Sequence, residues 1–380
     1  MGGRIIMSNA MGRARMGTAL GVALVASFLA ALAMAGAGVR FPAAAQPMRD
    51  PAPDTRPALV PAWLMPGRPA AVARHEMIAA ANPLAVEAGL QALRAGGSAA
   101  DAAVVVQLVL NLVEPQSSGI GGGAFALHWQ AASGRLQSYD GRETAPAAAT
   151  PERFLAGETP EKMRPMSLRE AIYSGASVGV PGTLRLLEAL HKEHGRLPWA
   201  QLLQPAIRLA EQGFPVSPRL YRLLRWYGAN SFSPGARRYF FDQGGSARPA
   251  GSVLKSPELA ATLKAIAERG ADAFYTGPIA EAIVTAVRNA PNHRGDITLA
   301  DLAGYRVKQR EPVCFVYRGN RVCGMGPPSS GGLAVGQVLK MVEAFDLGHG
   351  PADAMNPRAL HFITEAERLA FADRNRYIGD

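Results

Sequence analysis

One stretch limits what this chain can fold into more than any other: AADAAVVVQLVLNLVE, residues 99–114. As a helix it is apolar around nearly its whole circumference, so other elements of a layered fold must enclose it. It is too short to cross a bilayer. Ser98 and Asp101 stand three residues apart in the pattern of a capping pair, which predicts that the helix begins just after Ser98.

Further helices are predicted on both sides of this stretch. Before it, Asn82 is a suitable N-cap, Pro83 fits the first helical position and Gly96 stops the helix. The later segments with a helical pattern, some of which we expect proline or glycine to break, are residues 178–195, 198–217, 256–290, 327–345 and 356–380.

Two antiparallel hairpins complete the pattern. GIGGGAFALHW (119–129) and GRLQSYD (134–140) predict two strands joined by a turn at Gly134. CFVYRGNRVCGM (314–325) predicts a second hairpin. Helices that flank antiparallel strands predict an α+β architecture, with the strands between layers of helices.

The first 45 residues predict an export signal. Arg13 and Arg15 precede a long apolar run, and AAAQ at 43–46 offers small residues for cleavage. An uncleaved membrane anchor is the alternative. Residues 46–69, rich in proline and alanine, predict a flexible tether, and residues 70–380 the folded domain. No later run approaches spanning length, so we expect a periplasmic or secreted protein outside the membrane after signal cleavage.

Composition excludes several partners. The chain of 380 residues is 48% hydrophobic and 18% charged, as in ordinary globular proteins. Its formal net charge is +10, but part of that charge lies in the leader and the rest is spread along the chain. Basic and aromatic residues do not alternate as they do on nucleic-acid surfaces, so we expect no nucleic-acid partner.

The two cysteines, Cys314 and Cys323, would lie opposite each other in the second hairpin. An oxidising compartment would allow them to form a disulfide, and two unpaired small hydrophobic residues are the equal alternative. Two ligands with no histidine nearby do not make a metal site. We expect neither a metal nor a cofactor.

Three motifs have an ordinary structural interpretation. The glycines of 119–123 lead into a strand and lack a following Lys-Ser/Thr, which favours close backbone packing over phosphate binding. Ser329 and Ser330 precede a helix and could hold an anion, but N-capping is the commoner role. His191 and His194 share one face of a helix, for which exposure to solvent is a better interpretation than a metal pair.

Arg142, in YDGRETAP (139–146), is the candidate for substrate binding. A guanidinium can grip a carboxylate with two parallel hydrogen bonds, each contributing about 1.5–3 kcal/mol. Because Arg142 comes where a predicted strand ends, rigid backbone would aim it into a cleft. The structural alternative is solvation or an ion pair with Glu143.

The chain resembles the gamma-glutamyltransferase, or glutathione hydrolase, family. The resemblance runs from about residue 70 to 380 and is carried by five segments in family order: residues 82–127, 139–146, 179–195, 327–333 and 365–380. It implies the N-terminal-nucleophile hydrolase fold, in which helices cover both faces of two antiparallel sheets, here without the small-subunit half. It also implies that Arg142 binds the α-carboxylate of the glutamyl group.

In this family a precursor cuts itself into a large and a small subunit. The threonine that this frees attacks the γ-glutamyl amide of glutathione, with its own amino group as base. Water or an amino acid then receives the glutamyl group. The family's cleavage motif, a threonine pair followed by histidine, does not occur in these 380 residues. We therefore expect no catalytic residue in this chain and no activity from it alone.

Three hypotheses follow from the resemblance. The first is the large-subunit part of an exported gamma-glutamyltransferase that acts on glutathione or another γ-glutamyl compound, together with a small subunit from the same precursor. The second is a related acylase that removes glutaryl side chains from β-lactam nuclei, or a relative that acts on polyglutamate. The third is a non-catalytic descendant that binds γ-glutamyl ligands or a partner subunit.

Overall fold

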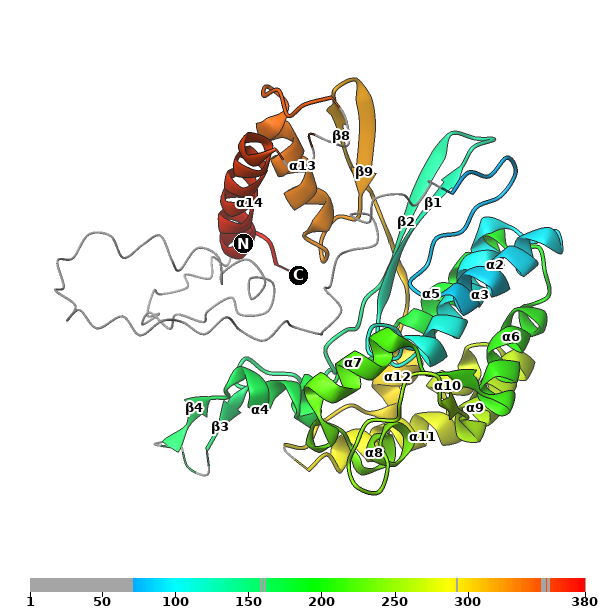
Figure 1. The fold of residues 1–380 in the computed structure, drawn as a ribbon. Helices are drawn as coiled ribbons and strands as arrows, with labels where there is room; N and C mark the ends of the chain where they lie inside the picture. Colours follow the sequence, from blue (N-terminus) through cyan, green and yellow to red (C-terminus); the bar gives the residue numbers. More distant parts are fainter. Residues whose placement is uncertain are drawn as a thin grey trace, which may run out of the picture. The chain divides into compact units, whose positions relative to one another are not determined.

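The computed structural model describes residues 71–379 apart from 158, 160, 161, 292, 350–352, 354 and 355. The predicted export signal (1–45) and tether (46–69) lie outside the described residues. Within them, α-helices occur together with antiparallel strands, which confirms the predicted α+β class (Figure 1). No helix of this part of the chain is both long and apolar enough to cross a membrane.

Two helices form where their capping residues predict. α2 (Pro83–Arg94) begins after Asn82, whose side chain accepts the N–H of the second helical residue. α3 (Ala99–Val113) begins after Ser98, which forms a reciprocal capping box with Asp101. Helices α2, α5 and α6 pack on α3 and bury most of its residues. The apolar stretch is therefore enclosed, as its sequence predicts.

The site is built around a three-stranded antiparallel sheet in the order β1–β2–β7. The predicted first hairpin forms β1 (Ala124–Gln130) and β2 (Arg135–Gly141). The third strand, β7 (Lys308–Arg310), pairs with Ser138–Asp140 of β2. The sequence did not predict β7, because three residues are too few to show a strand's alternation.

The two faces of this sheet have different neighbours, because successive side chains along a strand alternate between faces. Tyr139 is fully buried, and its hydroxyl donates to Glu193 of α5 (Thr183–His194) at 2.5 Å. Asp140, the next residue, contacts Arg310 of β7. One face of the sheet therefore rests on α5, and the other carries the charged groups described below.

Further helices follow α3 and α5 in the chain: α6 (Trp199–Gln212) packs on α3, α9 (Pro257–Arg269) packs on α6, and α11 (Gly277–Arg288) comes after them (Figure 1). The predicted break at Pro205 is wrong, because α6 continues through it. The carbonyl that loses its helical partner belongs to Gln201, an exposed residue, so water can satisfy it.

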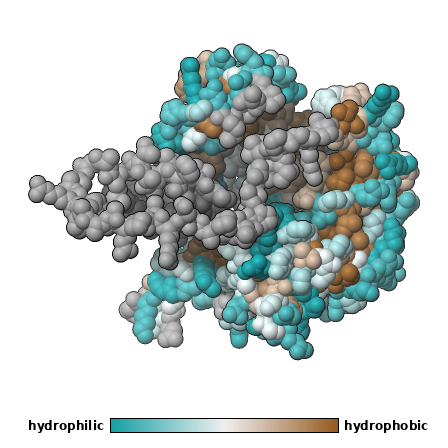
Figure 2. Space-filling model, in the orientation of Figure 1, coloured by the Kyte–Doolittle hydropathy of each residue, from teal (hydrophilic) through white to brown (hydrophobic). Residues whose placement is uncertain are grey.

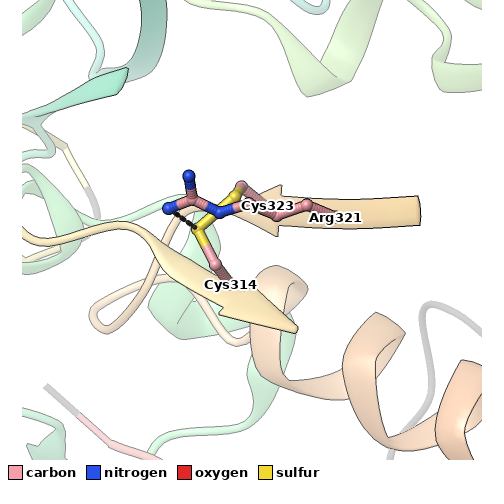
Figure 3. The surroundings of a disulfide bond; sticks show 3 residues. All are labelled: Cys314, Arg321 and Cys323. Atoms are coloured by element: carbon pink, nitrogen blue, oxygen red, sulfur yellow. Dashed lines mark hydrogen bonds between the residues drawn. A yellow bond between two sulfur atoms is a disulfide. The ribbon is translucent and has the colours of Figure 1, made fainter. Parts of the chain in front are cut away.

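The C-terminal part contains the predicted second hairpin and two helices (Figure 1). These elements are β8 (Val313–Tyr317), β9 (Asn320–Gly324), α13 (Gly331–Val342) and α14 (Pro357–Tyr377). Cys314 and Cys323 are directly opposite in the hairpin, with Cα atoms 4.1 Å apart, and they form a disulfide (Figure 3). The alternative of two unpaired cysteines is therefore wrong.

Shorter elements connect these parts. They are β3 (Leu155–Ala156), β4 (Arg164–Pro165), α4 (Leu168–Ile172), η3 (Gly175–Ser177), β5 (Phe214–Pro215), α7 (Pro218–Tyr227), η4 (Ala229–Ser231), α8 (Pro234–Phe240), β6 (Val253–Leu254), α10 (Asp272–Tyr275) and α12 (Leu299–Gly304).

Several large apolar side chains remain exposed. Trp129 on β1 is 55% exposed, and Leu369 and Phe371 on α14 are 50% and 54% exposed. Figure 2 also shows hydrophobic residues on the side of the molecule where α2 and α3 lie in Figure 1. Where such side chains form a contiguous patch, the patch usually marks a surface that binds a partner.

Candidate substrate-binding site

Arg142 follows β2 directly, and its backbone is held from two sides. Its N–H donates to Asp140 Oδ1 at 2.9 Å, and its carbonyl accepts a hydrogen bond from the Tyr305 hydroxyl at 2.7 Å. The preceding residue, Gly141, lies so close to α5 that an added Cβ would be 2.6 Å from Leu186 Cβ. These contacts fix the backbone from which the Arg142 side chain extends.

Asp140 also joins β2 to β7. Its side chain is only 6% exposed, and Arg310 Nε donates to Asp140 Oδ2 at 2.7 Å. The carboxylate therefore uses one oxygen for the Arg142 backbone and the other for a guanidinium. A buried carboxylate is stable only when it is paired in this way.

The Arg142 side chain is neither buried nor fully solvated. It is 48% exposed, and its Nε lies 3.5 Å from Glu143 Oε2, while its guanidinium carbon lies 6.0 Å from the centre of the Phe125 ring. Its terminal nitrogens make no hydrogen bond to any residue that the structure describes. The expected ion pair with Glu143 is present, but it involves Nε and leaves the two terminal nitrogens of the guanidinium available to a ligand.

The glycine-rich segment before β1 accommodates Glu143. A Cβ at Gly123 would lie 2.4 Å from Glu143 Oε2, so no larger residue fits without moving that carboxylate. The Gly122 carbonyl accepts hydrogen bonds from the N–H groups of Gly182 and Thr183 at 2.9 and 3.0 Å. These contacts support close backbone packing as the role of the glycines.

A cavity of about 340 Å³ opens beside Arg142. Its charged wall residues are Arg142, Arg306, Lys308, Arg310, Asp140 and Glu143, so the wall is net positive. Tyr305 also lines it, and burial together with the nearby carboxylates raises the pKa of Tyr305 to about 12. The tyrosine therefore remains a hydrogen-bond donor to the Arg142 carbonyl at neutral pH, and the cavity is suited to an anion.

The segment before α13 reaches the same cavity through Pro327 and Pro328. Ser330 occupies the N-cap position of α13, but its side chain makes no capping bond and instead lies 3.4 Å from Arg374 Nε. Ser329 Oγ accepts the N–H of Gly331 at 3.2 Å. Ser330 is therefore the N-cap residue, as predicted. The prediction that its side chain caps the helix is wrong.

The prediction that His191 and His194 face solvent is wrong. The His191 side chain is 18% exposed, and its Nε2 lies 2.8 Å from the Leu197 carbonyl oxygen. His194 stacks on His128 of β1 with ring centres 3.8 Å apart, and its Nε2 lies 2.8 Å from the Tyr139 hydroxyl. These histidines connect α5 to its neighbours, and they lie on the face of the sheet opposite Asp140.

A larger cavity, of about 840 Å³, lies beside α4, η4 and α11. Ser174, a buried polar residue on its wall, donates to the Ala171 carbonyl at 2.8 Å, and Glu170 pairs with Arg164 at 2.6 Å. These polar groups serve the local turns, so this cavity does not show the convergent charge found beside Arg142.

Comparison with known proteins identifies the family of the chain. The gamma-glutamyltranspeptidase family model matches residues 85–380. The chain is 36% identical over 309 residues to a glutathione hydrolase proenzyme of Bacillus subtilis, covering 81% of this chain and 51% of that protein. It is 40% identical over 305 residues to an acylase, the ACY 1 proenzyme of Pseudomonas, covering 78% and 52%.

A solved structure has the same fold. The crystal structure of Helicobacter pylori gamma-glutamyltranspeptidase is similar with a TM-score of 0.74 and 36% identity, over 82% of this chain and 86% of that chain. The fold is therefore that of a large-subunit portion of the N-terminal-nucleophile hydrolase class. The chain belongs to the gamma-glutamyltranspeptidase family, and it spans about half the length of the curated relatives it matches.

Five charged or polar residues of the cavity wall were missed by the sequence analysis: Asp140, Tyr305, Arg306, Lys308 and Arg310. Asp140 stands inside a quoted motif, but nothing in the sequence shows that its partner lies 170 residues away. The alternation in YRVKQR, residues 305–310, was an available signal, because basic residues at every second position share one face of a strand.

Proposed function

We propose that this chain is the large-subunit part of an exported gamma-glutamyltransferase, or glutathione hydrolase, and that Arg142 binds the α-carboxylate of the γ-glutamyl donor. The observation that carries the proposal is a half-exposed guanidinium on the wall of a net-positive cavity, with its backbone fixed from two sides. A planar fork in that position suits bidentate binding of a carboxylate.

In this reaction Arg142 orients the donor and takes no proton. Gripping the α-carboxylate fixes the distance from the guanidinium to the γ-carbonyl carbon, so that carbon is held where a nucleophile can attack it. The nucleophile is a threonine hydroxyl of a small subunit made from the same precursor. Addition to the carbonyl releases the amine of the donor, and water or an amino acid then takes the glutamyl group from the acyl-enzyme.

Two observations support a partner subunit. Relatives of this chain carry the word proenzyme in their names, and they are about twice as long as the segment matched here. Large apolar side chains on β1 and α14 are exposed. The leader pattern in residues 1–45 supports export to the periplasm or the medium, where the Cys314–Cys323 disulfide is stable.

The test is a pair of substitutions in the full gene product. With Arg142→Ala we expect kcat/KM for a γ-glutamyl anilide to fall by about 10²- to 10⁴-fold, because two charge-assisted hydrogen bonds are lost. With Arg142→Lys we expect partial recovery, because a point charge replaces a fork. Anilide hydrolysis measures both variants.

The matched control is Arg94→Ala at the end of α2, where a 59%-exposed arginine pairs with Glu76 at 3.6 Å. It should keep full activity. If Arg142→Ala retains the turnover of the unmodified enzyme, Arg142 does not bind the donor.

An acylase activity is the second candidate, because the Pseudomonas relative named acylase is 40% identical. A glutaryl side chain has a carboxylate but no α-amino group. Comparing the hydrolysis of glutathione with that of a glutaryl amide therefore separates the two functions. We expect glutathione to be the better substrate, and preference for the glutaryl amide would favour the acylase.

A further inference from the structure

The cavity beside Arg142 holds more positive charge than one carboxylate uses. Arg310 is committed to the buried Asp140 at 2.7 Å, and Arg142 lies 3.5 Å from Glu143. These two pairs account for both carboxylates on the wall. Arg306 and Lys308 remain as surplus cations.

The strand pairing explains why the surplus faces the cavity. Lys308 is directly opposite Asp140 in the β2–β7 pair, and Ser138 is opposite Arg310. Directly opposed residues project to the same face, so Lys308, Arg310 and Asp140 share one face. Gln309, between them, projects to the other face and donates to Glu193 at 2.8 Å.

Lys308 and Arg306 differ in the hydrogen bonds that their charged groups make within the protein. Arg306 Nη1 donates to the carbonyls of Ala303 and Tyr305, both at 2.8 Å, which holds its guanidinium in place. The Lys308 ammonium makes no hydrogen bond or ion pair with any residue in the described part of the chain, and its side chain is exposed at the cavity wall.

We propose that Lys308, with Arg306 beside it, forms a second carboxylate-binding position, which holds the carboxylate at the leaving-group end of the donor. This inference rests on the proposed function, because Arg142 must occupy the first carboxylate. Glutathione is such a donor: it carries an α-carboxylate on its glutamyl residue and another on its glycine, on the far side of the scissile amide.

The spacing suits two carboxylates of one small peptide. Directly opposed residues of an antiparallel pair lie about 5 Å apart, and Arg142 is two residues, about 7 Å, beyond the residue opposite Lys308. The distance between the backbones of Arg142 and Lys308 is therefore larger than the width of a single carboxylate. They lie close enough for both side chains to reach one tripeptide.

The test compares two donors in the full gene product. Glutathione has the second carboxylate, and a γ-glutamyl anilide has a neutral leaving group. With Lys308→Met we expect kcat/KM for glutathione to fall about tenfold, mainly through KM, because one charge-assisted contact is lost. We expect kcat/KM for the anilide to change less than twofold, and Lys308→Arg to restore glutathione hydrolysis.

Ionic strength provides a second readout. In the unmodified enzyme, salt should raise KM for glutathione more than for the anilide, because an exposed ammonium is screened. In Lys308→Met that difference should shrink. The control is Lys264→Met on α9, an exposed lysine paired with Glu211, which should change neither donor.

The outcomes are distinguishable. An equal loss for both donors would show a structural role for Lys308 and overturn the second position, as would no loss for either donor. If the unmodified enzyme hydrolyses neither donor, the proposed function is wrong and this binding position is wrong with it.

Discussion

Asp140 connects β2, the strand that Arg142 directly follows, to a strand that begins 168 residues after Asp140 in the chain. Its two carboxylate oxygens bind different partners, the Arg142 backbone N–H and the Arg310 guanidinium. At the scale of the residue, the proposed binding of the donor by Arg142 therefore depends on an ion pair between Asp140 and Arg310, which does not itself contact the donor.

Arg310→Met should lower the free energy of unfolding by about 3 kcal/mol, because it leaves a buried carboxylate without its counter-ion. Urea unfolding measures the change. Adding Asp140→Asn to the same chain should restore part of the loss, since no unpaired charge then remains. Ordinary surface substitutions change the free energy of unfolding by about 0.5 kcal/mol or less. A change no larger than this for Arg310→Met would contradict a stabilising ion pair between Arg310 and Asp140.

At the scale of the elements, Asp101 joins the start of α3 to the turn between α5 and α6. The capping box with Ser98 follows from sequence spacing alone. The structure adds two partners that the spacing does not indicate: Asp101 Oδ2 accepts the N–H groups of Arg196 and Leu197 at 2.9 and 3.3 Å. The residue is completely buried.

Comparing two substitutions separates the local role of Asp101 from its tertiary role. Ser98→Ala breaks only the capping box and should destabilise the protein by about 1 kcal/mol. Asp101→Ala also leaves the partly buried N–H groups of Arg196 and Leu197 without an acceptor, so the free energy of unfolding should fall by about 3 kcal/mol. Chemical denaturation tests both, and equal losses would show that Asp101 acts only as a cap.

Local sequence signals located the long elements, but they missed the shortest strand of the sheet and predicted a break that does not occur. The caps of α2 and α3 and both hairpins were predicted, because each has its signal within a few residues. β7 was missed, since a three-residue strand exists only through its pairing with β2. The expected break in α6 did not occur, because an exposed carbonyl tolerates Pro205.

At the scale of the whole molecule, stability should depend on acid through the contact between β1 and α5. Burial, and then the neighbouring His194, lower the pKa of His128, while Glu193 opposes this shift. The folded protein therefore binds fewer protons at His128 than the unfolded chain, whose histidine has a pKa of about 6.5.

Neutral His128 therefore stabilises the folded protein. Its contribution to the free energy of unfolding is complete above about pH 6.5 and is lost as the pH falls through the lowered pKa of His128 in the folded protein. His128→Phe keeps an aromatic ring in the stack but removes the titration. Its unfolding free energy should fall less between pH 7 and pH 5 than that of the unmodified protein.

The control for this pH dependence is His361→Gln on α14, whose imidazole lies outside the contact between β1 and α5. It should leave the contact between β1 and α5, and the loss of stability that this contact causes between pH 7 and pH 5, in place. Identical pH profiles for His128→Phe and the unmodified protein would contradict a role for His128.

The sequence by itself determined which segments become long helices and hairpins, and that Arg142 follows a strand end, because these features depend on residues close together in the chain. It also indicated the family, since five segments carry that resemblance in order. Only the tertiary structure decided that Asp140, Tyr305, Lys308 and Arg310 surround Arg142, and that Cys314 and Cys323 are joined. The physical reason is that the cavity wall depends on pairing between segments more than 160 residues apart, which no local pattern records.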